Sequence, residues 1–446
     1  MSGLEASAKP FGISKQEVWD AWVKVRGNKG SSGVDGVSIG AFERDLKDNL
    51  YKVWNRMSSG TYFPPDVKAV PIPKGGGGGV RILGVPTVAD RVAQTVVAVH
   101  LSQRVEPVFH PDSYGYRPGK SALDAVAAAR QRCWKFDWVV EFDIRKFFDT
   151  VPWPKIVAVV EAHTEARWVV LYVRRWLAAG MRLPDGSVTE RWQGTPQGSA
   201  VSPVLANLLL HYAFDAWMAR EFPDCPFERY ADDGVIHCRT KARAERVLAA
   251  LRARMTEVGL ELHPDKTRIV YCKDNNRHGE FPRSGFTFLG FTFQPRGARD
   301  KHGVIFAAFL PAISKQALKR LSRTVRSWRL HKRTRDGTAD LARMINPVIR
   351  GWLSYYGRFY HSALSQLLYR VNTYLLRWIR QKYRVGWKEA ARRMARLPAA
   401  ARLLRSLDLG TPGRGQDRSD KSRITGDCYV RICGSPGVRS PRATRP

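Results

Sequence analysis

The chain is long, strongly basic and apolar enough to fold. Its 446 residues exceed what one hydrophobic core usually serves, so two or three domains are expected, and 44% hydrophobic residues exclude a disordered protein. A formal net charge of +34 is extreme for an enzyme of small metabolites and favours a polyanionic partner, nucleic acid first. Residues 312–446 hold 31 Lys and Arg against 7 Asp and Glu, which predicts a dedicated binding surface there.

Other compositional signals point away from membranes and disulfides. No apolar run is long enough to cross a membrane and no signal-peptide core is found, so a soluble, cytoplasmic protein is expected. Six scattered cysteines suit a reducing compartment. Cys428 and Cys433 are the only close pair, and without a second pair nearby they do not predict a four-ligand metal site.

Two glycine-rich segments lie in the first hundred residues. The loop over 26–36, with Asn28 and Lys29, brings backbone amides within reach of another chain or a phosphate, or is a flexible connector. Residues 67–74 and 80–83 predict two strands joined by five glycines. Lys74 and Arg81 flank that tip, where two cations can clasp a triphosphate or form a solvated basic hairpin.

The middle of the chain alternates predicted helices and strands. Helices are predicted after Thr87 or Asp90, either of which can cap the first turn, and over 122–132. Residues 138–143 form an apolar run ending in Asp143, typical of a buried strand that carries a carboxylate at its end, although such an acid is often a helix cap or ion-pair partner. A second Gly-rich turn over 193–199 precedes Ser202-Pro203, a predicted helix start whose N-terminus suits a nucleotide.

The tetrapeptide Tyr230-Ala231-Asp232-Asp233 places two carboxylates between two β-prone runs, with Gly234 predicted to close the turn. Asp-Asp-Gly is also a common surface turn. If this hairpin and the strand ending in Asp143 are sheet neighbours, the three acids converge, and all-oxygen ligation favours two Mg²⁺ ions. Two metals about 3.5–4 Å apart activate a 3′-hydroxyl and steady a leaving pyrophosphate, which is polymerase chemistry.

The rest of the chain predicts first mixed structure and then basic helices. A helix follows Thr240 and stops at Gly259, residues 260–267 form a loop or strand, and 285–293 form one strand with an aromatic face. Helices are predicted from residue 313, with Arg, Trp and Tyr on faces that suit bases and phosphates. Their apolar stripes are Ile313, Leu318, Leu321, Val325 and Trp328, then Leu364, Leu367, Leu368, Val371, Tyr374, Leu375, Trp378 and Ile379. Beyond about residue 408 weak order is expected.

Several motifs, taken in order, resemble those of group II intron-encoded reverse transcriptases and maturases. They are Asn28-Lys29-Gly30 to Gly36, Arg81 to Gln94, Tyr116-Arg117-Pro118-Gly119, Phe142-Asp143, Gly194 to Ser199, Tyr230 to Asp233, Pro264 to Thr267 and Phe288-Leu289-Gly290-Phe291. Residues 313–385, with Ile345-Asn346-Pro347 and Arg350-Gly351-Trp352, resemble the maturase-specific X or thumb region. The resemblance implies an α+β right-hand polymerase, with fingers and palm in 1–300, a helical thumb or X domain in 301–400 and a basic, weakly ordered tail in 401–446.

The resemblance also implies roles for single residues. It makes Asp143, Asp232 and Asp233 ligands of two Mg²⁺ ions, with the Ile144 carbonyl a further ligand. Lys74 and Arg81 become triphosphate contacts, Phe148 the gate against a ribose 2′-hydroxyl, and Gln197 a wall of the nascent base pair. Lys266 protonates or stabilises the leaving pyrophosphate, or contacts a phosphate. RNA contacts are expected at Asn28, Lys29, Arg117, Arg350, Trp352, Arg377 and Arg380.

The implied partners are template RNA, primer DNA, dNTPs, target DNA and a group II intron RNA whose splicing the protein promotes. The run of five glycines after Lys74 is longer than the usual tip of the fingers hairpin in the family. Its length affects how tightly the hairpin closes around a triphosphate. No Cys/His-rich endonuclease module follows the basic helices, so another primer source, such as a nascent strand at a replication fork, is expected. Two alternatives are a CRISPR-associated or diversity-generating reverse transcriptase, disfavoured by the X region, and a splicing cofactor that only binds RNA, disfavoured by the three acids.

Overall fold

The computed structural model describes residues 9–73, 79–299 and 302–395, which divide into two compact units. Among these described residues, the first unit draws on positions up to 125 and on 140–268, and the second on 126–139 and on positions from 269 to 395. The strands after residue 285 therefore group with the basic helices, whereas the expected boundary lay near residue 300. The tail expected over 401–446, with Cys428 and Cys433, lies outside the described residues.

The first unit begins with three helices and a longer fourth one. They are α1 (Lys15–Gly27), α2 (Ile39–Arg44), α3 (Leu46–Ser58) and α4 (Val88–Val105). A capping box starts α1: the Ser14 hydroxyl accepts from the Glu17 amide at 3.1 Å, and the Glu17 carboxylate accepts from the Ser14 amide at 2.7 Å. Because α4 is buried over most of its first half and packs against α1 and α3, it is the centre of this region.

The predicted basic hairpin is present. Its strands are β1 (Val67–Pro73) and β2 (Val80–Val85), antiparallel, with Lys68 opposite Val85 and Pro73 opposite Val80. Two short strands that were not predicted, β4 (Met181–Arg182) and β5 (Val188–Thr189), extend the sheet to the order β2-β1-β4-β5. Lys74 and residues 75–78 of the tip lie outside the described residues.

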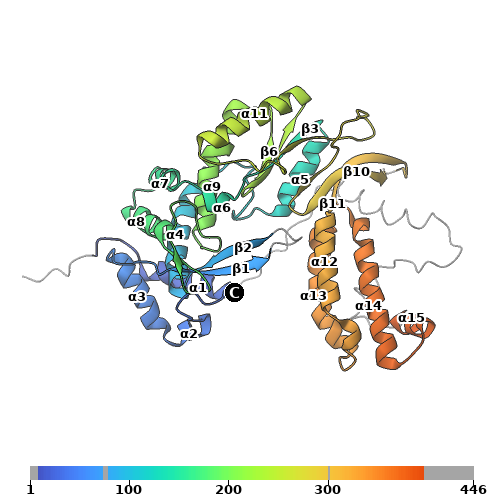
Figure 1. The fold of residues 1–446 in the computed structure, drawn as a ribbon, viewed down its shortest axis with the longest axis horizontal. Helices are drawn as coiled ribbons and strands as arrows, with labels where there is room; N and C mark the ends of the chain where they lie inside the picture. Colours follow the sequence, from blue (N-terminus) through green and yellow to red (C-terminus); the bar gives the residue numbers. More distant parts are fainter. Residues whose placement is uncertain (1–8, 74–78, 300–301, 396–446) are drawn as a thin grey trace, which may run out of the picture. The chain divides into compact units, whose positions relative to one another are not determined.

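A second four-stranded sheet carries the acidic hairpin. It comprises β6 (Phe227–Tyr230), β7 (Asp233–Cys238), β3 (Trp138–Asp143) and β8 (Arg268–Tyr271), in the order β6-β7-β3-β8. The residues of β3 are buried until Asp143, as the apolar run predicted. Helix α11 (Lys241–Glu257), capped by the Thr240 hydroxyl as predicted, packs against β7. Figure 1 shows this helix beside the sheet that contains β6 and β3.

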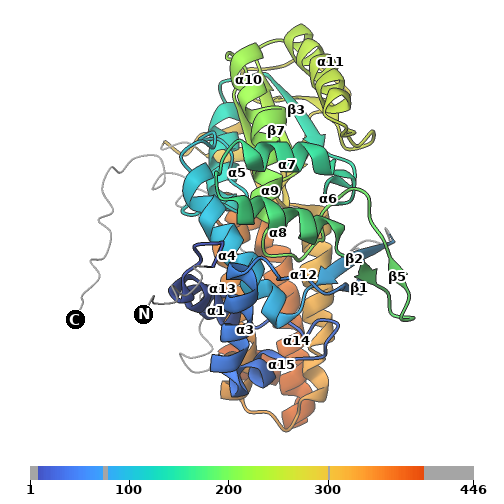
Figure 2. The ribbon, with the colours of Figure 1, turned by 90° about the vertical axis from the view of Figure 1, so that its left-hand side faces the viewer.

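The segment between β3 and β6 is mainly helical. Its helices are α6 (Phe147–Thr150), α7 (Trp153–Glu161), α8 (Arg167–Ala178), α9 (Ser202–Leu210) and α10 (Ala216–Glu221). Helix α7 packs against both α8 and α9 (Figure 2). The predicted helix at Ser202 is present, but Val201 occupies the cap position, so Ser202 does not cap it. A π-helical turn, His211–Asp215, lies between α9 and α10.

The second unit contains a three-stranded antiparallel sheet in the order β11-β10-β9. Its strands are β9 (Phe286–Phe288), β10 (Phe291–Arg299) and β11 (Ile305–Ile313), and helix α5 (Ala122–Cys133) ends in this unit. The single strand predicted over 285–293 is wrong, because Leu289 and Gly290, with φ of 50° and 82°, form a two-residue turn. The helical assignment of Ile313 is also wrong: it lies opposite Phe291 in the unpredicted β11.

Within residues 302–395 the α-helices that follow this sheet are α12 (Lys315–Ser327), α13 (Thr338–Tyr356), α14 (Ser365–Tyr383) and α15 (Trp387–Ala395). The predicted stripe on α14 is buried at Leu367, Leu368, Val371, Leu375, Trp378 and Ile379. Tyr374, which was assigned to that stripe, is only partly buried and lines a cavity. None of the helices in the described ranges is long and apolar enough to cross a membrane.

Candidate active site

The acidic hairpin ends in a two-residue turn. Tyr230 and Asp233 form the last pair of β6 and β7, so Ala231 and Asp232 make the turn, with Ala231 in the left-handed region at φ 56°. Gly234 does not close the turn as predicted, because it lies inside β7 opposite Arg229. A Cβ at Gly234 would come within 2.4 Å of the Phe142 ring, so close packing against β3 requires glycine there.

A buried arginine, Arg229, stabilises the turn through hydrogen bonds. Arg229 donates from Nε and Nη2 to the Asp215 carboxylate at 2.7 and 2.6 Å, and from Nη1 to the Ala231 carbonyl at 3.1 Å. It also reaches Asn207 Oδ1 at 3.1 Å and Ser113 Oγ at 2.8 Å. With Arg229 and Asp215 both fully buried, this paired network fixes an otherwise strained turn. Sequence reasoning missed Arg229 and Asp215, since no local pattern links them.

Asp143 lies beside this turn, as the prediction of neighbouring strands required. The amide of Ile144 donates to the Asp232 carbonyl at 3.3 Å, which joins the end of β3 to the hairpin tip. The Lys266 ammonium lies 2.9 Å from Asp143 Oδ2, in an exposed ion pair. The structure therefore brings Asp143, Ile144, Asp232 and Lys266 together. Asp233 follows Asp232 directly and is the first residue of β7.

The acids repel one another. Burial raises the pKa of Asp233 well above its ordinary range, and the charges of Asp143, Asp232 and Glu141 raise it further. Burial and Asp143 likewise raise the pKa of Asp232, while Lys266 and Arg81 oppose the rise. One lysine and one arginine thus offset only part of the negative charge, a condition that a divalent cation relieves.

The donor set fits a hard cation in its chemistry, because carboxylate and carbonyl oxygens are the ligands that Mg²⁺ prefers. In the described part of the chain, however, no three His, Cys, Asp or Glu side chains are grouped closely enough to hold a metal ion. The position of Asp143 beside the turn that carries Asp232 and Asp233, together with the oxygen chemistry of these residues, supports a cation here. Ligation by these residues remains a prediction.

Two of the predicted nucleotide-binding residues meet beside this site. Arg81 Nε on β2 donates to Gln197 Oε1, and Gln197 Nε2 donates to Asp149 Oδ1 at 3.4 Å. The Gly84 amide donates to the Gln197 carbonyl at 2.8 Å, which ties the loop 194–199 to β2. The charge of Arg81 also lowers the pKa of Asp232, so Arg81 lies near that acid as well as near the loop. Lys74 lies outside the described residues.

Phe148 packs in the floor under that loop. It is 9% exposed and contacts the Phe147 ring edge to face. Its carbonyl accepts from the Thr195 amide at 2.7 Å. Gly194, at φ 79°, passes so close that a Cβ would lie 2.7 Å from the carbonyl oxygens of Phe148 and Asp149. The predicted gate residue is therefore coupled to the Gly-rich loop by backbone contact.

A buried network that sequence reasoning missed supports the loop from the other side. On α4, Gln94 Oε1 accepts from the Ser199 hydroxyl and the Ala200 amide, both at 2.8 Å. Gln94 Nε2 in turn donates to Asp90 Oδ2 at 2.9 Å. Asp90 also accepts from Tyr62 at 2.8 Å and Trp176 at 2.7 Å. The Asp90-to-Gln94 spacing of one helical turn was the only available signal.

The expected RNA contacts near the N-terminus differ in exposure. Asn28 is the C-cap of α1, and Lys29 follows it with φ 48°. The side chain of Arg117 is only 6% exposed and pairs with Glu106 at 2.8 Å, and its role as an RNA contact stays a prediction. Its Nη1 donates to the carbonyls of His110 and Ser113, so the residue orders the loop that leads to Gly115.

The remaining expected RNA contacts lie in the second unit. Arg350 on α13 is exposed, whereas Trp352 stacks on Trp328 with ring centroids 5.7 Å apart. Arg377 and Arg380 on α14 line one cavity. Their roles as RNA contacts stay predictions.

The first unit places acids at the end of β3 and at the tip of the neighbouring hairpin. Comparison of the chain with known protein families is consistent with this arrangement. Residues 72–293, about half of the chain, match the family described as reverse transcriptase (RNA-dependent DNA polymerase). Residues 318–397 match the group II intron, maturase-specific domain. The chain belongs to the group II intron-encoded reverse transcriptases and maturases, as the motifs predicted.

Two curated relatives illustrate the similarity. The group II intron-encoded protein LtrA of Lactococcus lactis subsp. cremoris is 30% identical over 191 residues, which are 43% of this chain and 32% of that protein. Protein YkfC of Escherichia coli K12 is 28% identical over 297 residues, 58% of this chain and 74% of that protein. The chain thus spans about a third of the length of LtrA. Among solved structures, telomerase from Candida albicans gives a TM-score of 0.44 at 11% identity, covering 89% of this chain and 68% of that one.

Proposed function

We propose that the chain copies RNA into DNA and also binds a group II intron RNA to promote its splicing. The observation that supports the first activity is that Asp143 ends β3 beside the turn that carries Asp232 and Asp233. The maturase-specific match over 318–397 and the basic C-terminal third support the second. In splicing the protein supplies binding energy, while the RNA carries out the chemistry.

The polymerase site assigns each residue one task. Asp143, Asp232 and Asp233, with the Ile144 carbonyl, hold two Mg²⁺ ions, which supply activation of a 3′-hydroxyl and stabilisation of pyrophosphate when bound. Lys266 is close enough to Asp143 to shift from that ion pair to the leaving pyrophosphate, where it donates a proton or stabilises charge.

The neighbouring loop holds the incoming nucleotide. Arg81, together with Lys74, contacts the triphosphate, and Gln197 lines the nascent base pair. Phe148 fills the space that a ribose 2′-hydroxyl would need, which selects dNTPs over ribonucleotides. The Arg81–Gln197 hydrogen bond keeps both side chains at one place before the substrate arrives.

Primer extension on an RNA template with Mg²⁺ and dNTPs tests the polymerase. We expect the parent to extend the primer and the double variant Asp232→Asn, Asp233→Asn to lose at least about 100-fold in rate, the loss typical when charge stabilisation is removed. Asp48→Asn, an exposed acid on α3, is the matched control and should extend normally. Robust synthesis by the double variant, or none by the parent, would contradict the catalytic assignment.

Splicing needs a separate assay, since the two activities use different residues. Sequencing RNA that copurifies with the protein identifies the intron, and self-splicing of that intron at low Mg²⁺ then reports the maturase. The double variant should still promote splicing because its RNA-binding surface is intact. If it folds but fails to do so, the proposed separation of polymerase and maturase roles is wrong.

A further inference from the structure

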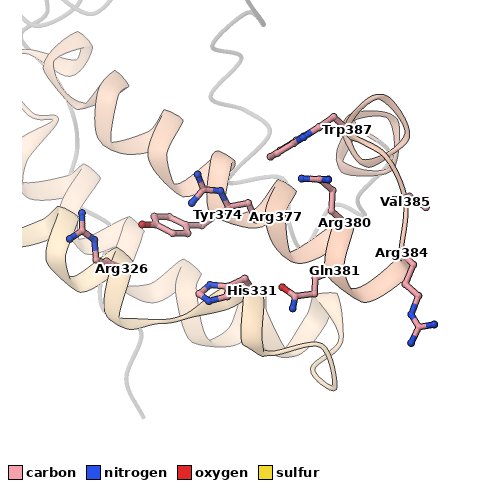
Figure 3. A pocket seen from close by; sticks show the side chains of 9 residues that line it. All are labelled: Arg326, His331, Tyr374, Arg377, Arg380, Gln381, Arg384, Val385 and Trp387. Atoms are coloured by element: carbon pink, nitrogen blue, oxygen red, sulfur yellow. The ribbon is translucent and has the colours of Figure 1, made fainter.

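Two cavities lie next to each other along α14 in the second unit. The first, of about 770 Å³, is lined by residues of α12, the 3₁₀ turn Leu330–Lys332, α14 and α15 (Figure 3). The second, of about 610 Å³, is lined by residues of α14 between Ser365 and Arg377. Tyr374 and Arg377 line both, so the two cavities form one continuous track, here called the α14 track.

The lining of the first cavity is basic and aromatic. It holds four arginines, Arg326, Arg377, Arg380 and Arg384, together with His331, Tyr374 and Trp387, and no Asp or Glu is among its described lining residues. Arg380 lies 4.1 Å from the Trp387 ring centroid, and Figure 3 shows the two side chains reaching toward each other from α14 and the start of α15. A cavity of this composition suits a ligand that combines an anion with a flat, apolar group.

Two groups in this cavity lack the partners that a closed protein core would give them. Trp387 is 50% exposed, although tryptophan is among the side chains most readily buried. The Nε of Arg380 is buried and has no hydrogen-bond partner among the residues that the structure describes. Trp387 and Arg380, which lie against each other, thus present an exposed aromatic surface beside a cation, a pair that suits a ligand with a flat group and an anion.

The track has the length and the spacing of a strand, not of a single small molecule. Its α14 residues recur every three or four positions from Gln366 to Gln381, which places them on one helix face. At 1.5 Å per residue, this face is about 23 Å long. Tyr369, 60% exposed, continues the aromatic surface into the second cavity. Alternating arginines and aromatic rings along such a length match alternating phosphates and bases.

We propose that the α14 track binds an unpaired RNA segment, with one base extruded into the first cavity against Trp387 and Tyr374 and its phosphates on Arg326, Arg377 and Arg380. The proposal rests on the proposed RNA-binding function and names the kind of RNA that this surface selects. In a duplex the base faces are stacked and closed to aromatic side chains, so single-stranded loops and bulges are favoured over paired RNA.

Affinity measurements with matched variants test the track. We expect a labelled, unstructured RNA to bind the full chain at least 10-fold more tightly than a hairpin of equal length. Trp387→Leu should weaken binding of the unstructured RNA roughly 5- to 100-fold, whereas Trp387→Phe, which keeps a stacking ring, should recover most of it. Arg326→Gln should lower the salt slope by about 0.7, whereas Arg323→Gln, exposed on the same helix but outside the cavity, should leave binding nearly unchanged apart from a small general charge effect.

Crosslinking shows where on the chain the RNA binds. RNA carrying 4-thiouridine should crosslink, after irradiation, to peptides that contain Tyr374 or Trp387. Equal effects of the Arg326 and Arg323 variants, equal binding of hairpin and unstructured RNA, or crosslinks that all lie outside 365–395 would overturn the proposal. Primer extension by the parent, measured in parallel with a preformed primer and template, separates this outcome from a failure of the polymerase assignment.

Discussion

The position of Asp232 depends on close contact between two backbones at Gly115. A Cβ at Gly115 would lie 2.6 Å from the Ala231 nitrogen and 3.1 Å from the Tyr230 carbonyl carbon. Neither atom belongs to a flexible side chain, so the hairpin tip itself would have to move. The turn is already held in a left-handed conformation at Ala231 by the buried Arg229, so it has little freedom to adapt.

Gly115→Ala should therefore displace the acids. We expect about 1–3 kcal/mol of lost stability from overpacking and at least a 10-fold fall in primer-extension rate, because a shift of about 1 Å near reacting groups costs about 100-fold. Gly40→Ala is the control: a Cβ there meets nothing within 4 Å, and Gly40 lies in α2, where alanine is the better helix former. Normal extension by Gly115→Ala would show that the contact does not position the turn.

Asp90 makes stability depend on pH. Burial raises its pKa from 3.8 to about 6, although hydrogen bonds from Trp176, Tyr62 and Gln94 oppose the rise. Between these two values the folded state binds more protons than the unfolded state, so stability falls as pH increases. A shift of about two pH units corresponds to about 3 kcal/mol.

The variant Asp90→Asn, which carries no titrating group, isolates this effect. Urea unfolding at a series of pH values should show the parent losing about 3 kcal/mol relative to the variant from pH 3.5 to pH 6.5, whatever the variant's absolute stability. The control Asp48→Asn, at an exposed position, should change little relative to the parent over the same range. A constant difference between parent and Asp90→Asn would mean that Asp90 titrates as an ordinary carboxyl group.

At this scale the sequence predicted residues whose signal is local. Asp143 follows an apolar run and Asp232 lies in a turn between two β-prone segments, and the structure joins these two strand ends. Arg229 and Gln94 could not be found in this way, because their importance comes from partners up to 116 residues away. The partners of Arg117 were not visible either, because no pattern in the sequence shows that Glu106 and two carbonyl groups surround it.

Among elements, helix α4 positions the Gly-rich loop before α9. Gln94 accepts two hydrogen bonds from the loop, and Arg81 and Gly84 of β2 contact Gln197 on its other side. A helix and a strand thus hold the same short segment from opposite sides. The loop reaches the floor formed by Phe148, so its position sets the space left for a nucleotide.

Gln94→Leu should loosen this loop. The change leaves the Ser199 hydroxyl and the Ala200 amide without their acceptor, at a cost of about 1–3 kcal/mol for each buried group. We expect the KM for dNTP to rise at least fivefold while the unfolding transition remains cooperative. Thr95→Val, the next residue on the same helix, loses only a hydrogen bond to the Arg91 carbonyl and should keep the parent KM. Equal KM values for both variants would exclude the positioning role.

Strands with short or aromatic sequences were the elements least visible in the sequence. The run 285–293 has the composition of one strand, but the left-handed pair Leu289-Gly290 folds it into a hairpin. Its partner β11 ends at Ile313, just before Ser314 caps α12, so an apolar residue at a strand end was taken for the start of a helical stripe. Periodicity alone cannot separate these states when the apolar run is short.

For the molecule as a whole, charge is the dominant property. The net charge of +34 belongs mostly to residues 312–446, and the α14 track concentrates four arginines in one cavity. Binding to RNA therefore releases many counterions. With roughly six phosphates neutralised on a single strand, affinity should fall about 100- to 1,000-fold between 50 and 200 mM salt.

Fluorescence anisotropy with an unstructured RNA, at 50, 100 and 200 mM potassium chloride, measures this slope. Thermal unfolding at the same three salt concentrations is the control, because a folded-state change would mimic lost binding. A fall of less than 10-fold with unchanged unfolding would mean that fewer than about three phosphates are contacted, too few for a surface of this charge to act as the main RNA-binding site. In the triple variant Arg326→Gln, Arg377→Gln, Arg380→Gln, the slope of log affinity against log salt concentration should be smaller than the parent's by about two units, since each phosphate contact contributes about 0.7. That result would place much of the salt dependence on the α14 track.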